Sequence, residues 1–187
     1  MFLIIFTSCE NDITEVRKWG HYEDIPTEVG TNVEMLYSDS FQVRVKVFAP
    51  RLVRYGGAKV REEFNEGIEV DFIGNNLKTT SRLTAKRATK KTITVKDEKG
   101  RTKREPVVII RDSVVLVSNN GEMMKTDELI WFEHSDKLSS NKFVTIIRPD
   151  EVIYGYGFDS DKEFGRWRIR SVTGRFKSDS FKNDFQD

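Results

Sequence analysis

The sequence contains few of the residues that carry enzyme chemistry. Among 187 residues there is one cysteine, Cys9, and there are two histidines, His21 and His134. One cysteine cannot form an intramolecular disulfide, and neither histidine lies at a spacing typical of metal ligands. No Gly-x-Ser-x-Gly motif provides an activated serine. The sequence therefore indicates no catalytic residue, metal or cofactor, and we predict a protein that is not an enzyme.

Long apolar runs and an excess of one charge are also missing. No run approaches the ~18 apolar residues that span a bilayer, and 31 basic residues balance 30 acidic ones. This balance gives no overall attraction to nucleic acid or anionic membrane. The exception is the stretch from Lys78 to Arg104, which holds eleven basic and two acidic residues but no aromatic residue for base stacking. It is either a surface for phosphates or a solvated hairpin whose lysines protect an edge strand from aggregation.

What the sequence has in quantity is strand-forming residues in alternating patterns. Aromatic residues make up 11% of the chain against four prolines, and apolar and polar residues alternate over 41–47 and 68–72, as in half-buried strands. Such segments recur about every 8–12 residues, with turn residues such as Asn75-Asn76 and Asn119-Asn120-Gly121 between them. The pattern predicts one all-β domain: a sandwich, a barrel or an open jelly roll.

Three sets of three residues, each with its members three positions apart, suggest a repeated strand unit. Each set, called a triplet here, follows an apolar strand-like run. Repeated strand–turn–strand units cannot bury an apolar face alone, so they stack into a longer sheet. A stacked, open-ended sheet is more often a binding scaffold than an enzyme. The triplets are Met123, Thr126 and Leu129; Val152, Gly155 and Phe158; and Leu77, Thr80 and Leu83.

Glycine, proline and polar residues predict local interruptions of these strands. Gly155 and Gly157 lie one residue apart in an aromatic segment, which predicts a strand bend or bulge there. We expect Pro50 to end the strand that begins near residue 41. Arg111-Asp112 is expected to separate two short strands.

The first nine residues end in Cys9 and resemble the end of a bacterial lipoprotein signal, in which the cysteine becomes lipid-modified. The segment departs from that pattern at Phe6, where Leu is usual. It also lacks a basic n-region, and its apolar run is shorter than the ~7–15 residues of a normal signal. A start codon assigned too far downstream would explain the short run and the missing basic region. The alternative is a short core strand with a buried free thiol, but the polar residues from Glu10 onward favour the lipoprotein interpretation.

The remaining chain divides by composition into three parts. Residues 10–32 are polar and weakly patterned, and we predict a tether. Residues 33–176 contain the predicted β domain. Residues 177–187 form a polar tail that we expect to be frayed.

Four segments of this domain match a known family in order and spacing. They are Tyr37-Ser-Asp-Ser40 with 43–50, Glu62 to Phe72, Lys125 to Trp131, and Phe143 to Phe158 with its Pro149-Asp-Glu-Val-Ile-Tyr-Gly-Tyr-Gly157. Together they resemble the LptC family, the periplasmic inner-membrane component of lipopolysaccharide export in Gram-negative bacteria, in the form found in Bacteroidetes. The resemblance covers about Val33 to Phe176. Two departures are the lack of the N-terminal transmembrane helix known from the family and the strongly basic stretch before Arg104.

The resemblance implies a twisted, boat-shaped, open-seamed antiparallel β jelly roll of the LptA-like (OstA) type. Such a protein receives lipopolysaccharide from an inner-membrane ABC transporter in an apolar groove. It passes the lipid to an LptA-like periplasmic protein joined by edge-strand pairing. The implied location is the periplasmic side of the inner membrane, held by a lipid anchor or a missing N-terminal segment. The candidate groove residues, each of which could instead be plain core, are Val45, Val47, Ile68, Val70, Phe72, Leu83, Leu116, Leu129, Trp131, Val144 and Ile146.

Three alternatives remain open from the residues alone. A lipid-anchored carbohydrate- or surface-binding β-sandwich without a transport role would have a sealed core and an exposed aromatic platform. A glycan hydrolase would need two carboxylates facing each other across a cleft. A purely structural interaction module would need only open strand edges.

Overall fold

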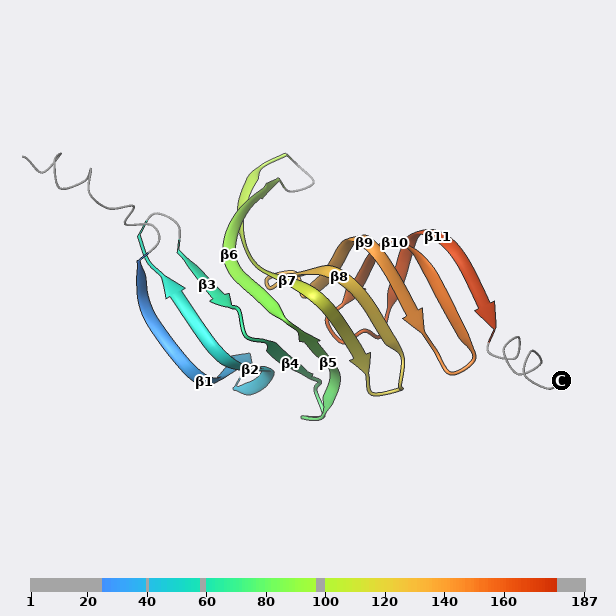
Figure 1. Ribbon diagram of the computed structural model, residues 1–187, viewed down its shortest axis with the longest axis horizontal. Helices are drawn as coiled ribbons and strands as arrows, with labels where there is room; N and C mark the ends of the chain where they lie inside the picture. Colours follow the sequence, from blue (N-terminus) through green and yellow to red (C-terminus); the bar gives the residue numbers. More distant parts are fainter. Residues whose placement is uncertain (1–24, 40, 58–59, 97–99, 178–187) are drawn as a thin grey trace, which may run out of the picture.

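The computed structural model describes residues 25–39, 41–57, 60–96 and 100–177, and all regular structure among them is β. The strands follow one another along the molecule from β1 to β11 (Figure 1). Their bounds are β1 Pro26–Asp39, β2 Gln42–Tyr55, β3 Arg61–Phe64, β4 Ile68–Ile73, β5 Thr79–Ala85, β6 Arg87–Lys96, β7 Thr102–Ser118, β8 Met123–Phe132, β9 Lys137–Ile147, β10 Glu151–Asp161 and β11 Trp167–Lys177.

All strand pairs are antiparallel, and the sheet is folded over on itself. The order is β11-β10-β9-β8-β7-β5-β4-β2-β3-β6, with β1 beside β2 and β6 also beside β7. One edge of β7 pairs with β6 along its first part and with β5 along its last part. One edge of β2 divides in the same way between β4 and β3. We call the part with β4 and β5 half A and the part with β3 and β6 half B. The prediction of an all-β jelly roll is confirmed.

The long strands cross from one half to the other at a line of bends. In β7 the register shifts between Arg111 and Val114, where Asp112 and Ser113 have φ of 64° and 55°. Positive φ at two successive non-glycine residues is uncommon and marks a sharp change of direction. Asn32 in β1 (φ 49°) and Gly157 in β10 (φ 74°) lie on the same line. Each long strand therefore contributes one segment to each half of the roll.

Two predicted interruptions are wrong because strands bend where the sequence suggested that they end. β2 runs through Pro50, which falls between its pairing with β4 and its pairing with β3. A proline has no N–H to donate, and on that edge Pro50 has no strand partner that would accept a hydrogen bond. Arg111-Asp112 likewise does not separate two strands, since β7 continues through the bulge.

The predicted tether is also too long. β1 begins at Pro26, so residues 26–32 belong to a strand that pairs with the last part of β2. The alternating pattern is weak there because most of these side chains are exposed, and backbone pairing holds the strand. In the triplet that starts at Leu77, Leu77 is exposed in the β4–β5 turn, and β5 shifts register against β4 at Thr80.

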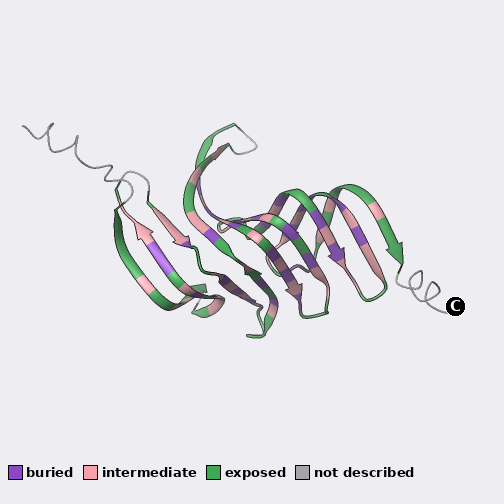
Figure 2. Ribbon diagram, in the orientation of Figure 1, coloured by how far each residue is buried: buried purple, intermediate pink, exposed green. Residues whose placement is uncertain are grey.

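The core lies between the two halves. Buried residues recur along β2 to β10, whereas β1 and β11 have none (Figure 2). In β4, for example, Ile68, Val70 and Phe72 are buried and the residues between them are half-buried. Alternate residues of a strand point to opposite faces, so this period-two pattern directs one face of each half inward.

Candidate functional site: the apolar interior

The apolar interior of the folded sheet holds every groove residue that the sequence suggested. All eleven are at most 5% exposed and belong to one cluster. Half A supplies part of the cluster, including Phe72 and Ile146, and half B supplies Leu129 and Trp131. The cluster is continuous from β2 to β10. These side chains share one interior and fill it.

Several interior residues were not named from the sequence. Leu138 and Ile153 are buried and follow the same alternation as their neighbours, so the period-two signal would have found them. Phe164 is different. It lies in the β10–β11 turn, between Glu163 and Gly165, and nothing in that polar context predicts a fully buried ring.

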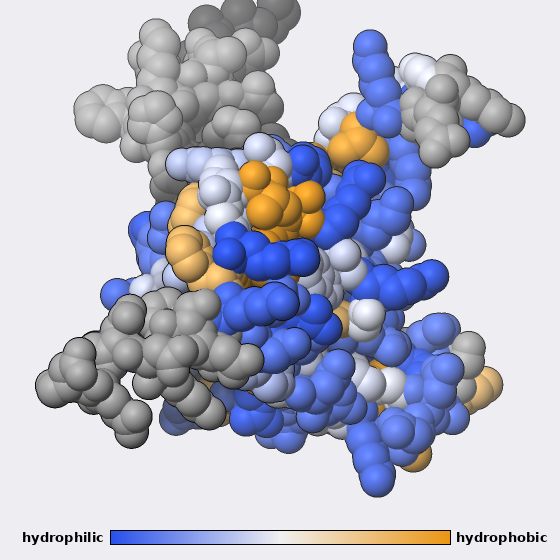
Figure 3. Space-filling view, turned by 90° about the vertical axis from the view of Figure 1, so that its right-hand side faces the viewer, coloured by the Kyte–Doolittle hydropathy of each residue, from blue (hydrophilic) through white to orange (hydrophobic). Residues whose placement is uncertain are grey.

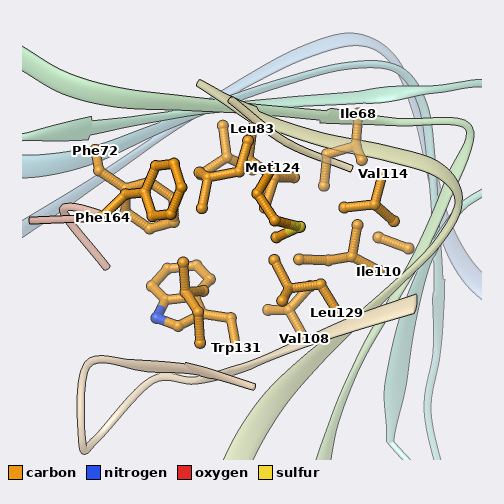
Figure 4. Packing of buried hydrophobic residues seen from close by; sticks show 14 of the residues in the cluster. Ile68, Phe72, Leu83, Val108, Ile110, Val114, Met124, Leu129, Trp131 and Phe164 are labelled. Carbon is orange, nitrogen blue, oxygen red and sulfur yellow. The ribbon is translucent and has the colours of Figure 1, made fainter. Parts of the chain in front are cut away.

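Aromatic rings are concentrated at one end of this interior. Phe72 and Trp131 make an edge-to-face contact with ring centroids 5.3 Å apart, and Phe164 lies 5.9 Å from Phe158 and 6.3 Å from Trp167. Figure 4 shows Phe72, Trp131 and Phe164 at the same end of the cluster. Trp131 Nε1 is buried and has no hydrogen-bond partner. A buried donor without an acceptor is uncommon and destabilising.

Each half has a margin, the edge formed by its hairpin turns. The β10–β11 turn lies across the margins of halves A and B. The Ser81 hydroxyl of β5 donates to the Lys162 carbonyl (2.9 Å), and Lys162 N–H donates to the Asp136 carbonyl (3.0 Å). The Lys162 ammonium also pairs with the Asp136 carboxylate at 2.7 Å. Within the turn, the Asp161 carboxylate accepts from the backbone of Gly165 at 2.9 Å. The turn therefore connects half B to half A and holds Phe164 inside.

A polar network joins the margins beside this turn. Trp167 Nε1 of half B donates to Glu122 Oε2 of half A (3.1 Å), and Glu122 Oε1 accepts from Arg148 (2.8 Å). Arg148 also donates to Glu151 at 2.9 Å. The hydrogen bond to Glu151 and the charge of Glu122 raise the pKa of Arg148 above its ordinary value. The indole and three charged groups close the margin by hydrogen bonds rather than by apolar packing.

A second polar contact crosses the interior near β1. Lys90 of β6 forms an ion pair with Glu133 at 2.8 Å and a hydrogen bond with the Tyr37 hydroxyl at 3.4 Å. Its ammonium lies 4.7 Å from the centre of the Tyr37 ring. Burial opposes the charged form, but the hydrogen bond and charge of Glu133 and the contacts with Tyr37 outweigh it and raise the pKa of Lys90.

The two glycines predicted to bend a strand lie where β10 changes register. β10 shifts against β11 between Tyr154 and Gly155, and against β9 between Tyr156 and Phe158. A side chain on Gly155 would meet Ile169 and the β11 backbone, so the two strands approach closely there. Gly157 has a positive φ that L-residues rarely adopt.

The basic stretch that ends at Arg104 spans β5, β6 and the start of β7, and the β6–β7 hairpin arches away from the rest of the sheet (Figure 1). Several of its charges have acidic partners. Arg82 binds Asp71 through two hydrogen bonds of 2.6 and 2.8 Å, and Arg87 pairs with Asp112. These pairs neutralise part of the stretch locally.

Apolar side chains are also exposed outside the interior. Phe143, Tyr154, Tyr156 and Phe176 form a chain of aromatic contacts across β9, β10 and β11, on the face opposite the core. Tyr156 is 55% exposed. Figure 3, which looks onto the β11 end, shows apolar residues gathered among hydrophilic ones. A surface depression of about 840 Å³ beside the β10–β11 turn is lined by charged and hydroxyl side chains together with Phe132, Leu138 and Trp167.

The remaining predictions concern the chain termini, metal binding and membrane spans. Cys9 and His21 lie outside the described residues, as does the tail after Lys177. Among the residues that are described, no group of three or more His, Cys, Asp or Glu side chains is placed to hold a metal. No helix in this part of the chain has the length and apolar character to cross a membrane.

The fold and the interior together define a jelly-roll protein with an elongated apolar core and a terminal strand at each end. The sequence model of the family described as lipopolysaccharide-assembly, LptC-related, matches residues 70–177, from β4 to the end of β11. This match covers more than half of the chain, and the protein belongs to that family. Family membership implies a role in lipopolysaccharide transport. No curated protein matches the chain significantly.

Proposed function

We propose that this protein is a component of the periplasmic bridge that carries lipopolysaccharide away from the inner membrane. It accepts the lipid from an inner-membrane ABC transporter, holds its acyl chains between halves A and B, and passes it to the next jelly-roll protein. The chain needs no energy source of its own, because the transporter drives the movement. The observation that carries the proposal is the single apolar cluster that runs from β2 to β10. An elongated apolar volume matches acyl chains in shape and polarity.

The two terminal strands support the hand-over step. Among the described residues, β1 pairs only with β2, and β11 pairs only with β10. An unpaired edge presents backbone donors and acceptors to which a strand of another protein can add. The terminal strands lie at opposite ends of the molecule (Figure 1). Strand addition at these ends would align the interiors of successive jelly rolls, one of them LptA-like, into one path.

The proposed location is the periplasmic side of the inner membrane, and Cys9 is the candidate site of a lipid anchor. An acyl anchor would keep the interior close to the transporter from which the lipid is received. Mass spectrometry of the mature N-terminus should find an acylated Cys9 as the first residue. An unmodified cysteine within a longer mature chain would remove the anchor from the proposal and leave the transport role intact.

A second candidate function is supported by two observations. The interior is filled in this structure, and the aromatic residues around Tyr156 form an exposed platform of the kind that binds sugars or surfaces. A surface-binding β-sandwich would use that platform and not the interior. Tyr156→Ala should then abolish function, whereas the transport proposal predicts that this variant still sustains lipopolysaccharide export.

Depletion of the protein in cells that encode it tests the proposed function. Lipopolysaccharide should accumulate at the inner membrane and disappear from the surface, and re-expression of the wild-type chain should restore export. Membrane fractionation and surface labelling of the lipid measure both effects. Normal surface lipopolysaccharide after complete depletion would contradict the transport role.

A further inference from the structure

The side chain of Phe164 reaches the interior from a turn rather than from a strand. The ring is fully buried against Phe158 and Trp167, although its backbone has a φ of 57°. A positive φ is unfavourable for a bulky residue, so the contacts around the turn must hold this conformation. An aromatic ring that enters a core from a strained turn can leave it when those contacts break.

Apart from the ring contacts of Phe164 and the hydrogen bonds within the turn itself, the contacts that hold the turn to the rest of the roll are polar. They are the Ser81–Lys162 and Lys162–Asp136 hydrogen bonds, the Lys162–Asp136 ion pair, and the Trp167–Glu122 hydrogen bond. Water can replace each of these partners when the turn moves outward. The strands that the turn connects stay paired without it, because β10 and β11 pair along their whole length.

The row of inner side chains that Phe164 contacts at one end contains an unused hydrogen-bond donor at its other end. Trp131, Leu138, Ser160 and Trp167 lie in one row on the inner face of half B, since each pairs with the next across β8 to β11. Phe164 contacts one end of this row, and the unpartnered Trp131 Nε1 lies at the other. A hydrocarbon chain alone would leave this N–H unsatisfied. A chain with an ester or amide carbonyl would supply the missing acceptor.

We propose that the β10–β11 turn is a gate in which Phe164 occupies the place of an acyl chain, and that Trp131 Nε1 donates to the ester or amide oxygen of the chain that replaces it. This inference rests on the proposed function and deepens it. The closed interior is the unloaded state. Outward movement of the turn opens the margin between the two halves and removes the ring, so that the incoming chain can extend along the row to the donor.

A reversible lock tests the gate. Asp136 and Lys162 are joined backbone to backbone at 3.0 Å and side chain to side chain at 2.7 Å, so a cysteine pair at these positions has the proximity that a disulfide needs. The full-length protein with Cys9→Ser, Asp136→Cys and Lys162→Cys is compared in its oxidised and reduced forms, with purified lipopolysaccharide as the probe. The reduced form and the Asp136→Cys single variant are the matched controls.

The gate predicts that oxidation weakens lipopolysaccharide binding by roughly tenfold or more and that reduction restores it. Phe164→Ala should bind roughly tenfold more tightly than wild type, because the lipid no longer displaces a buried ring. Equal binding by the oxidised and reduced forms would overturn the gate and leave the proposed function standing. No binding by the wild-type protein would overturn both.

A pair of lipids that differ in one carbonyl tests whether Trp131 Nε1 donates a hydrogen bond to the bound lipid. The probes are 1-tetradecanoyl lysophosphatidylcholine and its 1-O-tetradecyl ether analogue. Wild type should prefer the ester by about fivefold, the ratio expected for one neutral hydrogen bond. Trp131→Phe should lose that preference while it still folds and still binds the ether analogue, because it keeps an aromatic ring at this position and removes only the donor. An unchanged preference in Trp131→Phe would overturn the assignment of the donor.

Discussion

The N-terminal and C-terminal parts of the roll reach the same architecture by different means. In β1 to β6 the two halves are built mostly from separate short strands, and only β1 and β2 run through both. From β7 to β11 every strand is long and crosses the bend line.

The same contrast appears where the two halves meet across the interior. In the N-terminal part Lys90 of half B crosses to Tyr37 of half A through a hydrogen bond and pairs with Glu133 of its own half. In the C-terminal part the halves meet through the Trp167–Glu122 hydrogen bond and through a turn that inserts an apolar ring, Phe164. Acyl chains can replace an apolar ring, but they cannot replace an ion pair. The proposed gate therefore puts lipid entry in the C-terminal part and leaves the N-terminal part a supporting role.

The largest expected effect tests whether the two parts share one core. Phe72→Ala in β4 and Phe158→Ala in β10 each remove a fully buried ring. Each should lower the free energy of unfolding by about 3–5 kcal/mol, because both leave a cavity in the same cluster. Urea denaturation measures both. If Phe158→Ala cost far less than Phe72→Ala, the C-terminal part would be a separate and looser unit.

A smaller effect is expected at the close approach of β10 and β11. Gly155→Ala places a methyl group against the β11 backbone and should lower the free energy of unfolding by about 1–3 kcal/mol. Gly121→Ala is a useful control, because its φ is 83° but nothing lies within 4 Å of the added carbon. It should cost about 1 kcal/mol through backbone strain alone. Equal hydrogen exchange of β11 in Gly155→Ala and wild type would contradict the close packing.

Removing the contacts of Lys90 in the N-terminal part should have a pH-dependent effect on the free energy of unfolding. Lys90→Met should cost about 1 kcal/mol at neutral pH, because Glu133 and Tyr37 lose a charged partner. The pKa of Lys90 is raised, so its contribution is complete below the usual value of 10.5 and is lost as pH rises through the folded-state pKa. Lys91→Met, at an exposed neighbour, is the control. A difference from wild type that persists unchanged in strong alkali would show that the charge of Lys90 is not responsible.

The smallest effect is expected at the bend of β7. The Arg87 guanidinium holds the pKa of Asp112 below its ordinary value through a hydrogen bond and its charge. This exposed pair therefore stabilises the fold above the unfolded-state pKa of the carboxyl, and its contribution is lost as pH falls through the folded-state value. Asp112→Asn keeps a residue that tolerates positive φ. It should unfold like wild type at low pH and only slightly more easily at neutral pH.

The sequence predicted the strands and the inner face of the roll because both are set by local alternation. Val70, Leu116 and Val144 could be assigned to the interior from their neighbours alone. Pro50 and Asp112 were misread, because a bend and a strand end use the same residues and only the partner strands distinguish them. Phe164 could not be predicted at all. Its burial depends on Ser81 and Asp136, which are distant in the sequence and meet the turn only in the folded protein.

Photo-crosslinking in cells tests most directly whether lipopolysaccharide passes between the two halves. Crosslinking residues are placed at the inner positions Leu129 and Val144 and, as matched controls, at the outward neighbours Ile130 and Thr145, in proteins that still sustain export. Lipopolysaccharide should be captured at both inner positions and at neither outer one. Export without capture at the inner positions, or equal capture at all four, would contradict an interior that carries the lipid.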